Sequence, residues 1–302
     1  MRFKQKLKYW TSVFIFALGI ALLASSIVFS TTGPPPSYHQ GYARSVSKSA
    51  YPSLWKGLVG AWVPALGVTG VTLRDVSGFG QHGTLTSMDP GADWIIGGNP
   101  RLAGYGLRFD HSTGHVAITA LTEVVDLPAT HNFTVVFWFK AATVATNLVG
   151  FSWSGTDDLN FYPNDNAVGS GGTRVFWRDL GSNIISEDGP DLTGDWHRFV
   201  FVSRASDDHE AYRDGVSVGT SSATGAAGPF TSIRIGNFGT SQGFDGLLDD
   251  VRVYNRAWTN SEILLDYQIP LAPFILRPQL FVRAPVAAGV TPVLRMLMGV
   301  GQ

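Results

Sequence analysis

Short stretches in which apolar and polar residues alternate recur along the chain, and the clearest covers residues 244–254. Every second residue from Leu247 to Val253 falls on one face of an extended segment, and the residues between them fall on the other. This period of two is typical of a half-buried antiparallel strand. Asp249 shares the face of Val251 and Val253, so its carboxylate is expected to point toward the interior of a sandwich, where an unpaired charge is costly.

Other segments repeat this pattern, and long helical periodicity is scarce. Residues 132–141 form a strongly apolar stretch, which predicts a strand in the centre of a sheet. Asp214 and Gly215 stand between two alternating stretches and predict a tight turn, where the backbone needs a positive φ. Many turns and few helices favour an all-β sandwich or barrel.

The segment after the strand at 244–254 has the pattern of a short helix. Thr259 is a candidate N-cap and Glu262 stands three residues later, which is the spacing of a capping box. Ile263 and Tyr267 repeat at i and i+4, so one side of this helix can pack on a sheet. A strand, a turn and a short closing helix predict the end of a domain at residue 268.

The N-terminal region has a different pattern. Basic residues at Arg2, Lys4, Lys6 and Lys8 precede an apolar run over 13–29, which is typical of a signal peptide or an uncleaved signal-anchor covering residues 1–30. Residues 31–54 are rich in Pro, Ser and Gly and predict a flexible linker. The domain is therefore expected to be secreted or surface-tethered, in the extracellular space, with membrane contact only through the N-terminal segment.

Composition excludes several classes of function. The formal net charge is −1 and charged residues make up 15% of the chain, so the clustered Lys and Arg of a nucleic-acid-binding protein are absent. The sequence contains no cysteine, which excludes disulfides, thiolate metal ligands and a cysteine nucleophile.

Six motifs occur in the order in which they occur in one known family. The chain resembles the laminin G-like jelly-roll domains of the concanavalin A-like lectin/glucanase superfamily, and the resemblance covers about residues 57–268. It implies a two-sheet antiparallel jelly-roll sandwich over residues 55–268. The apolar run at 13–29 separately predicts a hydrophobic N-terminal helix outside the sandwich. The motifs read GLVGAW, then the Asp, Ser-Gly and Gly-Thr-Leu residues of RDVSGFGQHGTL, then GLRFDHSTGHVAI, GDWHRFVFVS, EAYRDGVSVGT and GLLDDVRVYNRAWTNSEI.

The resemblance also implies a structural Ca²⁺, held by the Asp of the closing strand and by backbone carbonyls near the first strand. Carried over to this chain, it nominates Asp249, with Asp75 as a second carboxylate. Hard cations such as Ca²⁺ prefer such oxygen ligands. The alternative is that Asp249 accepts backbone N–H groups or pairs with an arginine such as Arg74.

Catalysis is not expected. Glycoside hydrolysis needs two carboxylates that face each other across the sugar, and the glucanases of this fold carry them as alternating acids on one strand. This chain has no such run. The pairs at 157–158, 207–208 and 249–250 are adjacent in sequence, so a strand would send their side chains to opposite faces.

The least family-like stretch, residues 148–189, combines aromatic and polar residues in predicted loops. Aromatic rings beside hydrogen-bonding groups suit a sugar face, so Trp153, Tyr162, Trp177 and Arg178 are the candidate ligand-binding residues. The alternative is that these aromatic rings fill the core.

The expected function is non-catalytic recognition of a carbohydrate or glycoprotein through sandwich loops. The other hypothesis is a structural or adhesive surface or virion protein that self-associates through its tail. That tail, residues 269–302, is apolar, contains Arg277, Arg283 and Arg295 but no acid, and carries prolines that prevent a long helix.

Overall fold

The computed structural model describes residues 42–97, 99, 101–102, 104–119, 127–145, 149–155, 158–165, 172–177, 182–187, 189–224, 230–239 and 242–277. The predicted N-terminal segment and most of the predicted C-terminal tail lie outside these residues. Within them, no helix has the length and apolar character needed to cross a membrane.

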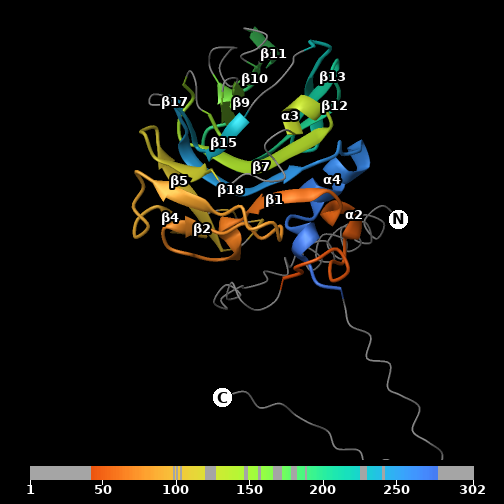
Figure 1. Cartoon of the computed structure of the whole chain (residues 1–302). Coiled ribbons are helices and arrows are strands. Elements are labelled where there is room, and N and C mark those ends of the chain that lie inside the picture. Colours follow the sequence, from red (N-terminus) through yellow and green to blue (C-terminus); the bar gives the residue numbers. More distant parts are fainter. Residues whose placement is uncertain are drawn as a thin grey trace, which may run out of the picture. The chain divides into compact units, whose positions relative to one another are not determined.

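Two large antiparallel sheets form the domain (Figure 1). In the first sheet the strand order is β14-β13-β12-β7-β18-β5-β4, and β1 also pairs with β18. Its strands are β1 (Leu58–Trp62), β4 (Trp94–Ile96), β5 (Tyr105–Asp110), β7 (Phe133–Ala141), β12 (His197–Ala205), β13 (Asp208–Arg213), β14 (Val216–Ser221) and β18 (Asp245–Tyr254). The strongly apolar segment predicted as a central strand is β7, which lies between β12 and β18.

The second sheet has the order β11-β10-β9-β8-β15-β6-β3-β2, and a separate pair, β16 (Asn237–Phe238) and β17 (Gln242–Gly243), follows β15. The predicted two-sheet antiparallel sandwich is confirmed. The strands of the second sheet are β2 (Thr72–Leu73), β3 (Gly83–Thr86), β6 (His115–Ile118), β8 (Phe151–Gly155), β9 (Asp158–Asp165), β10 (Gly172–Trp177), β11 (Ser182–Glu187) and β15 (Phe230–Ile235).

Aromatic side chains from both sheets fill the space between them. Phe133 of β7 meets Trp153 of β8 edge to face, with ring centroids 5.4 Å apart, and Phe161 of β9 meets Phe201 of β12 at 5.2 Å. All four rings have no exposed area. This inter-sheet core follows from the alternation of the strands, since every second residue faces the opposite sheet.

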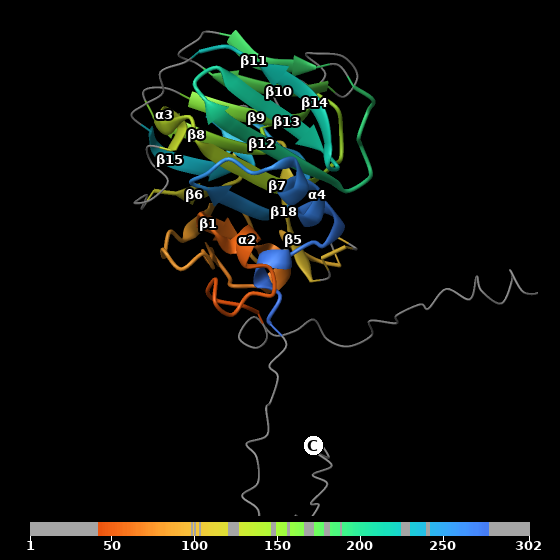
Figure 2. The same cartoon turned by 90° about the vertical axis from the view of Figure 1, so that its right-hand side faces the viewer.

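A second apolar cluster covers the outer face of the first sheet. It joins Trp138 of β7 and Val200 of β12 to short helices, so these helices form a third layer outside the first sheet. Figure 2 shows α4 in front of β18 and β7. The helices are α2 (Pro52–Trp55), α3 (Leu127–Thr130), α4 (Asn260–Gln268) and the 3₁₀ turns η1 (Pro64–Leu66) and η4 (Ala272–Phe274), and all of them except α3 supply residues to this cluster.

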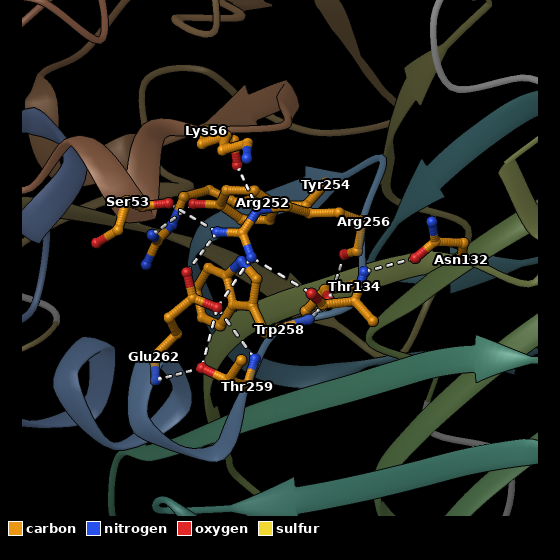
Figure 3. Close-up of polar contacts among 11 residues, drawn as sticks. Ser53, Lys56, Asn132, Thr134, Arg252, Tyr254, Arg256, Trp258, Thr259 and Glu262 are labelled. Atoms are coloured by element: carbon orange, nitrogen blue, oxygen red, sulfur yellow. Dashed lines mark hydrogen bonds and ion pairs between the residues drawn. The ribbon is translucent and has the colours of Figure 1, made fainter.

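The predicted closing helix and its capping box are confirmed as α4. The Thr259 hydroxyl accepts from the backbone N–H of Glu262, and the Glu262 carboxylate accepts from the backbone N–H of Thr259 at 3.0 Å. Arg256 then connects this turn to α2, since it donates to Glu262 at 2.7 Å and to the carbonyls of Ser53 and Lys56 at 2.7 Å each (Figure 3).

The folded part begins before the predicted boundary at Trp55. Ala43 and Leu54 are fully buried, although both lie in the stretch predicted to be a linker. The reason is long-range pairing, because Ala43 donates its backbone N–H to the carbonyl of Phe274 at 2.7 Å. A sequence window cannot show this contact.

A β-bulge in β18 corrects one expectation about Asp249. Leu248 lies opposite Phe139 and Asp249 opposite Trp138, but Arg252 lies opposite Val136, so two residues of β18 face a single residue of β7. Such an extra residue interrupts strict alternation. Leu248, Val251 and Val253 therefore face the inter-sheet core, and Asp249 faces outward with Trp138. The prediction that Asp249 points into the sandwich interior is wrong for this reason.

Candidate functional site

The outer face of the second sheet carries hydrogen-bonding side chains rather than a layer of helices. In β8 the core residues Phe151 and Trp153 alternate with Ser152 and Ser154, and the neighbouring strands β9, β10 and β15 alternate in the same way. We call the outward set the polar face. Its residues are Ser152, Ser154, Asp158, Asn160, Tyr162, Arg174, Ser232 and Arg234.

Strand register places these side chains in rows across the sheet. Arg234 of β15 lies opposite Ser152 of β8, which in turn lies opposite Asn160 of β9. On the next strand pair, Tyr162 of β9 lies opposite Arg174 of β10. Directly opposed side chains in a sheet are about 4.5–5.5 Å apart at Cβ. The rows therefore form a continuous polar layer from β15 to β10, in which Ser152, Asn160 and Tyr162 are buried and Arg174 and Arg234 are partly exposed.

Tyr162 is the aromatic centre of the polar face. The guanidinium carbon of Arg174 lies 3.9 Å from the centroid of the Tyr162 ring, which is a close cation–π contact. The Tyr162 hydroxyl donates to Oε1 of Gln242 on β17 at 3.2 Å. The ring itself is 2% exposed, whereas Arg174 and Gln242 are partly exposed. A ligand at this position would meet the arginine and the glutamine first.

The polar atoms of this face that are buried without a hydrogen-bond partner include Oδ1 of Asn160 on β9 and Oγ of Ser154 on β8. Ser152 lies beside them, but its hydroxyl donates to the carbonyl of Asn237 at 3.2 Å. An unpaired buried acceptor or hydroxyl costs about 1–3 kcal/mol. Both atoms are buried, so a bound molecule can reach them only where neighbouring side chains move aside.

Arg234 places a positive charge on the side of the polar face that adjoins β6. Burial lowers the pKa of His115 below its ordinary value, and the charge of Arg234 lowers it further. His115 is therefore neutral near neutral pH. It can donate or accept a hydrogen bond beside Arg234 without adding a second positive charge.

Among the predicted ligand-binding residues, Tyr162 lies on the polar face. Trp153 does not, since its side chain has no exposed area and contacts Phe133 and Phe151 in the core, so its predicted role in binding is wrong. Trp177 ends β10, and the position of its side chain is not among the described features; Arg178 lies outside the described residues.

Sequence reasoning missed Arg174, Asn160 and Gln242. The alternation of β9 could have paired Asn160 with Tyr162 on one face, because the two residues are two positions apart. Gln242 joins the site only through the fold, since 80 positions separate it from Tyr162.

Asp75, one of the two predicted calcium ligands, accepts backbone hydrogen bonds at both of its carboxylate oxygens. Its Oδ1 accepts from the N–H groups of Ala61 at 3.0 Å and Ser77 at 2.9 Å, and its Oδ2 accepts from Gln81 at 3.0 Å. These bonds fix the turn after β2 to β1, which is an ordinary role for an Asp in a turn.

Asp249 differs because only one of its oxygens is bonded. Oδ1 accepts from the N–H groups of Ala65 at 3.1 Å and Asp250 at 2.7 Å, whereas Oδ2 is buried without a partner. Burial raises the pKa of Asp249 well above its ordinary value, and the charge of Asp250 raises it further. The carboxyl group thus needs either a proton or a cation at Oδ2. Within the ranges that the structure covers, no three His, Cys, Asp or Glu side chains gather as a metal site.

Beside Asp249 lies a buried ionic network of two arginines and two aspartates. Arg198 of β12 contacts Asp250 at 3.0 Å and Asp266 of α4 at 2.7 Å, and Arg252 contacts the same two carboxylates at 2.8 Å and 2.6 Å. None of the four side chains has any exposed area. Burial alone would raise the pKa of Asp266, but Arg198 and Arg252 outweigh burial and hold this pKa below its ordinary value. The network joins α4 to the first sheet and leaves no group accessible to a ligand.

Solved structures share this fold at low sequence identity. Domain 4 of the extracellular GH43 arabinanase AbnA from Geobacillus stearothermophilus, in complex with arabinotriose, matches 68% of this chain and 96% of its own length, with a TM-score of 0.52 and 17% identity. Trypanosoma rangeli sialidase in complex with sialic acid matches 71% of this chain at a TM-score of 0.53 and 19% identity. This chain spans only 33% of the sialidase.

A third similar structure is the binding domain of Paraclostridial Mosquitocidal Protein 1. It matches 71% of this chain and 52% of its own length, with a TM-score of 0.51 and 14% identity. At such identities these likenesses concern the fold alone. No curated protein sequence matches the chain.

The sequence itself matches a family model over residues 110–264, which is half of the chain. The matched region runs from the end of β5 into α4 and so includes the polar face and, of the buried ionic network, Arg198, Asp250 and Arg252. The model is that of the concanavalin A-like lectin/glucanases superfamily, and the chain belongs to this family.

Proposed function

We propose that this protein is a non-catalytic extracellular recognition module that binds carbohydrate, free or on a glycoprotein, at its polar face. The observation that carries the proposal is the group around Tyr162, where Arg174 and Gln242 are partly exposed and Oδ1 of Asn160, two positions away on β9, is buried without a partner. Sugars present hydroxyl groups in fixed directions beside apolar ring faces. A polar sheet face with an aromatic centre and unpaired hydrogen-bonding atoms suits such a ligand.

The similar structures support the class of ligand. The arabinanase domain was solved with arabinotriose and the sialidase with sialic acid. Both ligands are carbohydrates, although they differ in charge and size. The fold hosts several functions, so the proposal depends on the residues of the polar face rather than on this likeness.

The carboxyl groups of the described residues support a non-catalytic role. A glycosidase needs an accessible carboxylic acid with a raised pKa as proton donor. Burial raises the pKa of Asp249 and Asp250, but neither side chain is exposed. Asp110 and Asp245 lie opposite each other on β5 and β18, yet the hydrogen bond from the Ser112 side chain lowers the pKa of Asp110. Asp110 is therefore ionised near neutral pH and cannot act as the acid.

Structural Ca²⁺ belongs to the same proposal, with Asp249 as its carboxylate. The unpartnered Oδ2 of Asp249 supports the choice, whereas both oxygens of Asp75 already accept backbone N–H groups of the turn. Ca²⁺ takes six to eight oxygen ligands, so backbone carbonyls and water would complete the shell. A metal bound in the native state only must raise the melting temperature. If Ca²⁺ binds here, it raises the melting temperature of the wild type but not that of Asp249→Asn. An equal response of both proteins would place the ion elsewhere.

A glycan panel with matched variants tests the polar face. The full chain is titrated with neutral and acidic oligosaccharides, and the best ligand is repeated with Arg174→Ala and Gln242→Ala. Hydrogen bonds to charged groups contribute about 1.5–3 kcal/mol, so Arg174→Ala is expected to weaken binding by tenfold or more. Arg108→Ala is the control, because Arg108 is 48% exposed on the first sheet and pairs with Asp93.

Two results would overturn the proposal. One is the absence of binding to any glycan by the folded wild-type protein. The other is a glycan that binds the wild type, Arg174→Ala and Gln242→Ala with one affinity, since the ligand would then lie away from the polar face.

A further inference from the structure

The first and last described segments of the chain, residues 42–50 and 271–277, lie side by side. Ala50 donates its backbone N–H to the carbonyl of Ile275 at 2.7 Å, and Arg277 donates to the carbonyl of Lys48 at 2.8 Å. Ser49 and Leu276 form an antiparallel bridge between the two segments. In Figure 2 the red start and the blue end of the coloured ribbon meet at the end of the domain opposite β14. The chain therefore enters and leaves the domain at one place.

This place carries exposed apolar side chains among exposed cations. Val46 is 46% exposed, Ile275 39% and Leu276 43%. We call this surface the terminal patch, and its residues are Arg44, Val46, Lys48, Ile275, Leu276 and Arg277, all of them exposed. Neither residues 42–50 nor residues 269–277 include an aspartate or a glutamate.

Apolar side chains beside cations, without acids, suit the surface of an anionic phospholipid bilayer. The apolar groups can enter the boundary between head groups and acyl chains. Each Lys or Arg near such a surface strengthens binding by about fivefold. An ordinary protein interface would not need this complete lack of acids, since protein partners present both signs of charge.

The sequence on both sides of the terminal patch has the same chemistry. The apolar run at 13–29 follows four basic residues, and Ser30 precedes Tyr42 by 12 positions. An extended chain covers at most about 3.5 Å per residue, so a bilayer entered by that run would lie within about 40 Å of the patch. On the other side, residues 278–302 contain Arg283 and Arg295 and no acid.

We infer that the terminal patch is a docking surface for an anionic phospholipid bilayer. The domain then rests on the membrane through this end, with β14 directed away from the lipid. Val46 and Leu276 contact the lipid boundary, and Lys48 and Arg277 contact the phosphate groups. The inference stands apart from carbohydrate binding, because it uses no residue of the polar face.

The absence of cysteine allows a direct test in the full chain. Ser47→Cys places one fluorescent label on the terminal patch, and Thr220→Cys places the same label on the exposed edge strand β14. Each protein is reconstituted into phosphatidylcholine vesicles with or without phosphatidylglycerol, and an aqueous quencher is added. The expected result is that the label at position 47 is shielded only in the anionic vesicles, while the label at position 220 is quenched equally in both.

Charge variants then identify the contacts. Lys48→Gln combined with Arg277→Gln removes two cations, which at about fivefold each should lower the ratio of docked to undocked domain about thirtyfold. Vesicle flotation checks that the variant is still associated with the vesicles when the shielding is measured. Lys48→Arg keeps the charge and should keep the shielding.

Equal quenching of position 47 in neutral and anionic vesicles would overturn the inference. Shielding that follows protein concentration rather than lipid composition would also overturn it, since a second copy of the chain would then cover the patch.

Discussion

Replacement of Asp266 by leucine tests the buried ionic network. In the wild type the two positive charges of Arg198 and Arg252 are balanced by Asp250 and Asp266, and all four groups are fully buried. Asp266→Leu leaves two guanidinium groups with one carboxylate, so one buried positive charge is uncompensated. Loss of one partner from a buried ion pair costs about 3–5 kcal/mol.

The expected loss is large enough to measure in two ways. Urea unfolding should show a decrease of about 3–5 kcal/mol in the free energy of unfolding. For a domain of this size each kcal/mol lowers the melting temperature by about 2–4 °C, so a loss of ~4 kcal/mol corresponds to about 8–16 °C. Asp208→Ala is the control, because Asp208 is 52% exposed in its pair with Arg204. Such surface pairs contribute about 0–1 kcal/mol.

A charge-balanced double variant separates charge from shape. Asp266→Leu combined with Arg252→Met leaves Arg198 paired with Asp250, so the buried charge is again zero. The double variant should be more stable than the sum of the two single losses predicts, by several kcal/mol, because each single change leaves an unpaired ion. Additive losses, or a loss below about 1 kcal/mol for Asp266→Leu, would refute the reasoning.

Three further predictions concern the carboxyl group of Asp249, the N-cap of α4 and a glycine of β18. The pKa of Asp249 is raised in the folded protein, mainly by burial. The protonated carboxyl therefore contributes fully to the free energy of unfolding below the pKa that Asp249 has in the unfolded chain. This contribution is lost as pH rises through the pKa of the folded state. Asp249→Asn should remove this alkaline loss from urea midpoints measured across pH in chelator, and an unchanged pH profile would contradict a protonated carboxyl. Thr259→Ala should cost about 1 kcal/mol in urea unfolding, because it removes the N-cap of α4, and a loss below a few tenths would show that packing alone holds the helix. Gly246→Ala should lower the melting temperature strongly, since φ is +138° there and the new Cβ would lie 2.1 Å from the carbonyl oxygen of Lys140; Gly239→Ala, at φ +71° in open space, is its control for backbone strain alone.

The parts of the fold that depend on neighbours in sequence could be predicted. Thr259 and Glu262 are three residues apart, and their capping box is present. Asp214 and Gly215 both have positive φ at the predicted turn. In each case the interacting residues lie within a few positions of one another, so the local sequence pattern is enough to predict the interaction.

The parts that depend on strand register could not be predicted. The alternation of β18 assigned Asp249 to the core face, but the extra residue between Asp249 and Arg252 reverses that assignment. Trp153 was expected beside a ligand, whereas its side chain lies in the core because β8 pairs with β15 and β9 in a register that directs this residue toward the other sheet. Of the candidate site, only Tyr162 was identified, because Arg174 and Gln242 reach it through pairings that no short window contains.

The meeting of residues 42–50 and 271–277 also makes the sandwich a natural insert. A domain whose two ends lie together can be placed within a surface loop of another protein without separating the ends of that loop. The same geometry means that a circularly permuted form of residues 42–277 needs only a short connection between its two ends. New termini at the turn between β13 and β14, around Asp214 and Gly215, would then leave both sheets and the polar face intact.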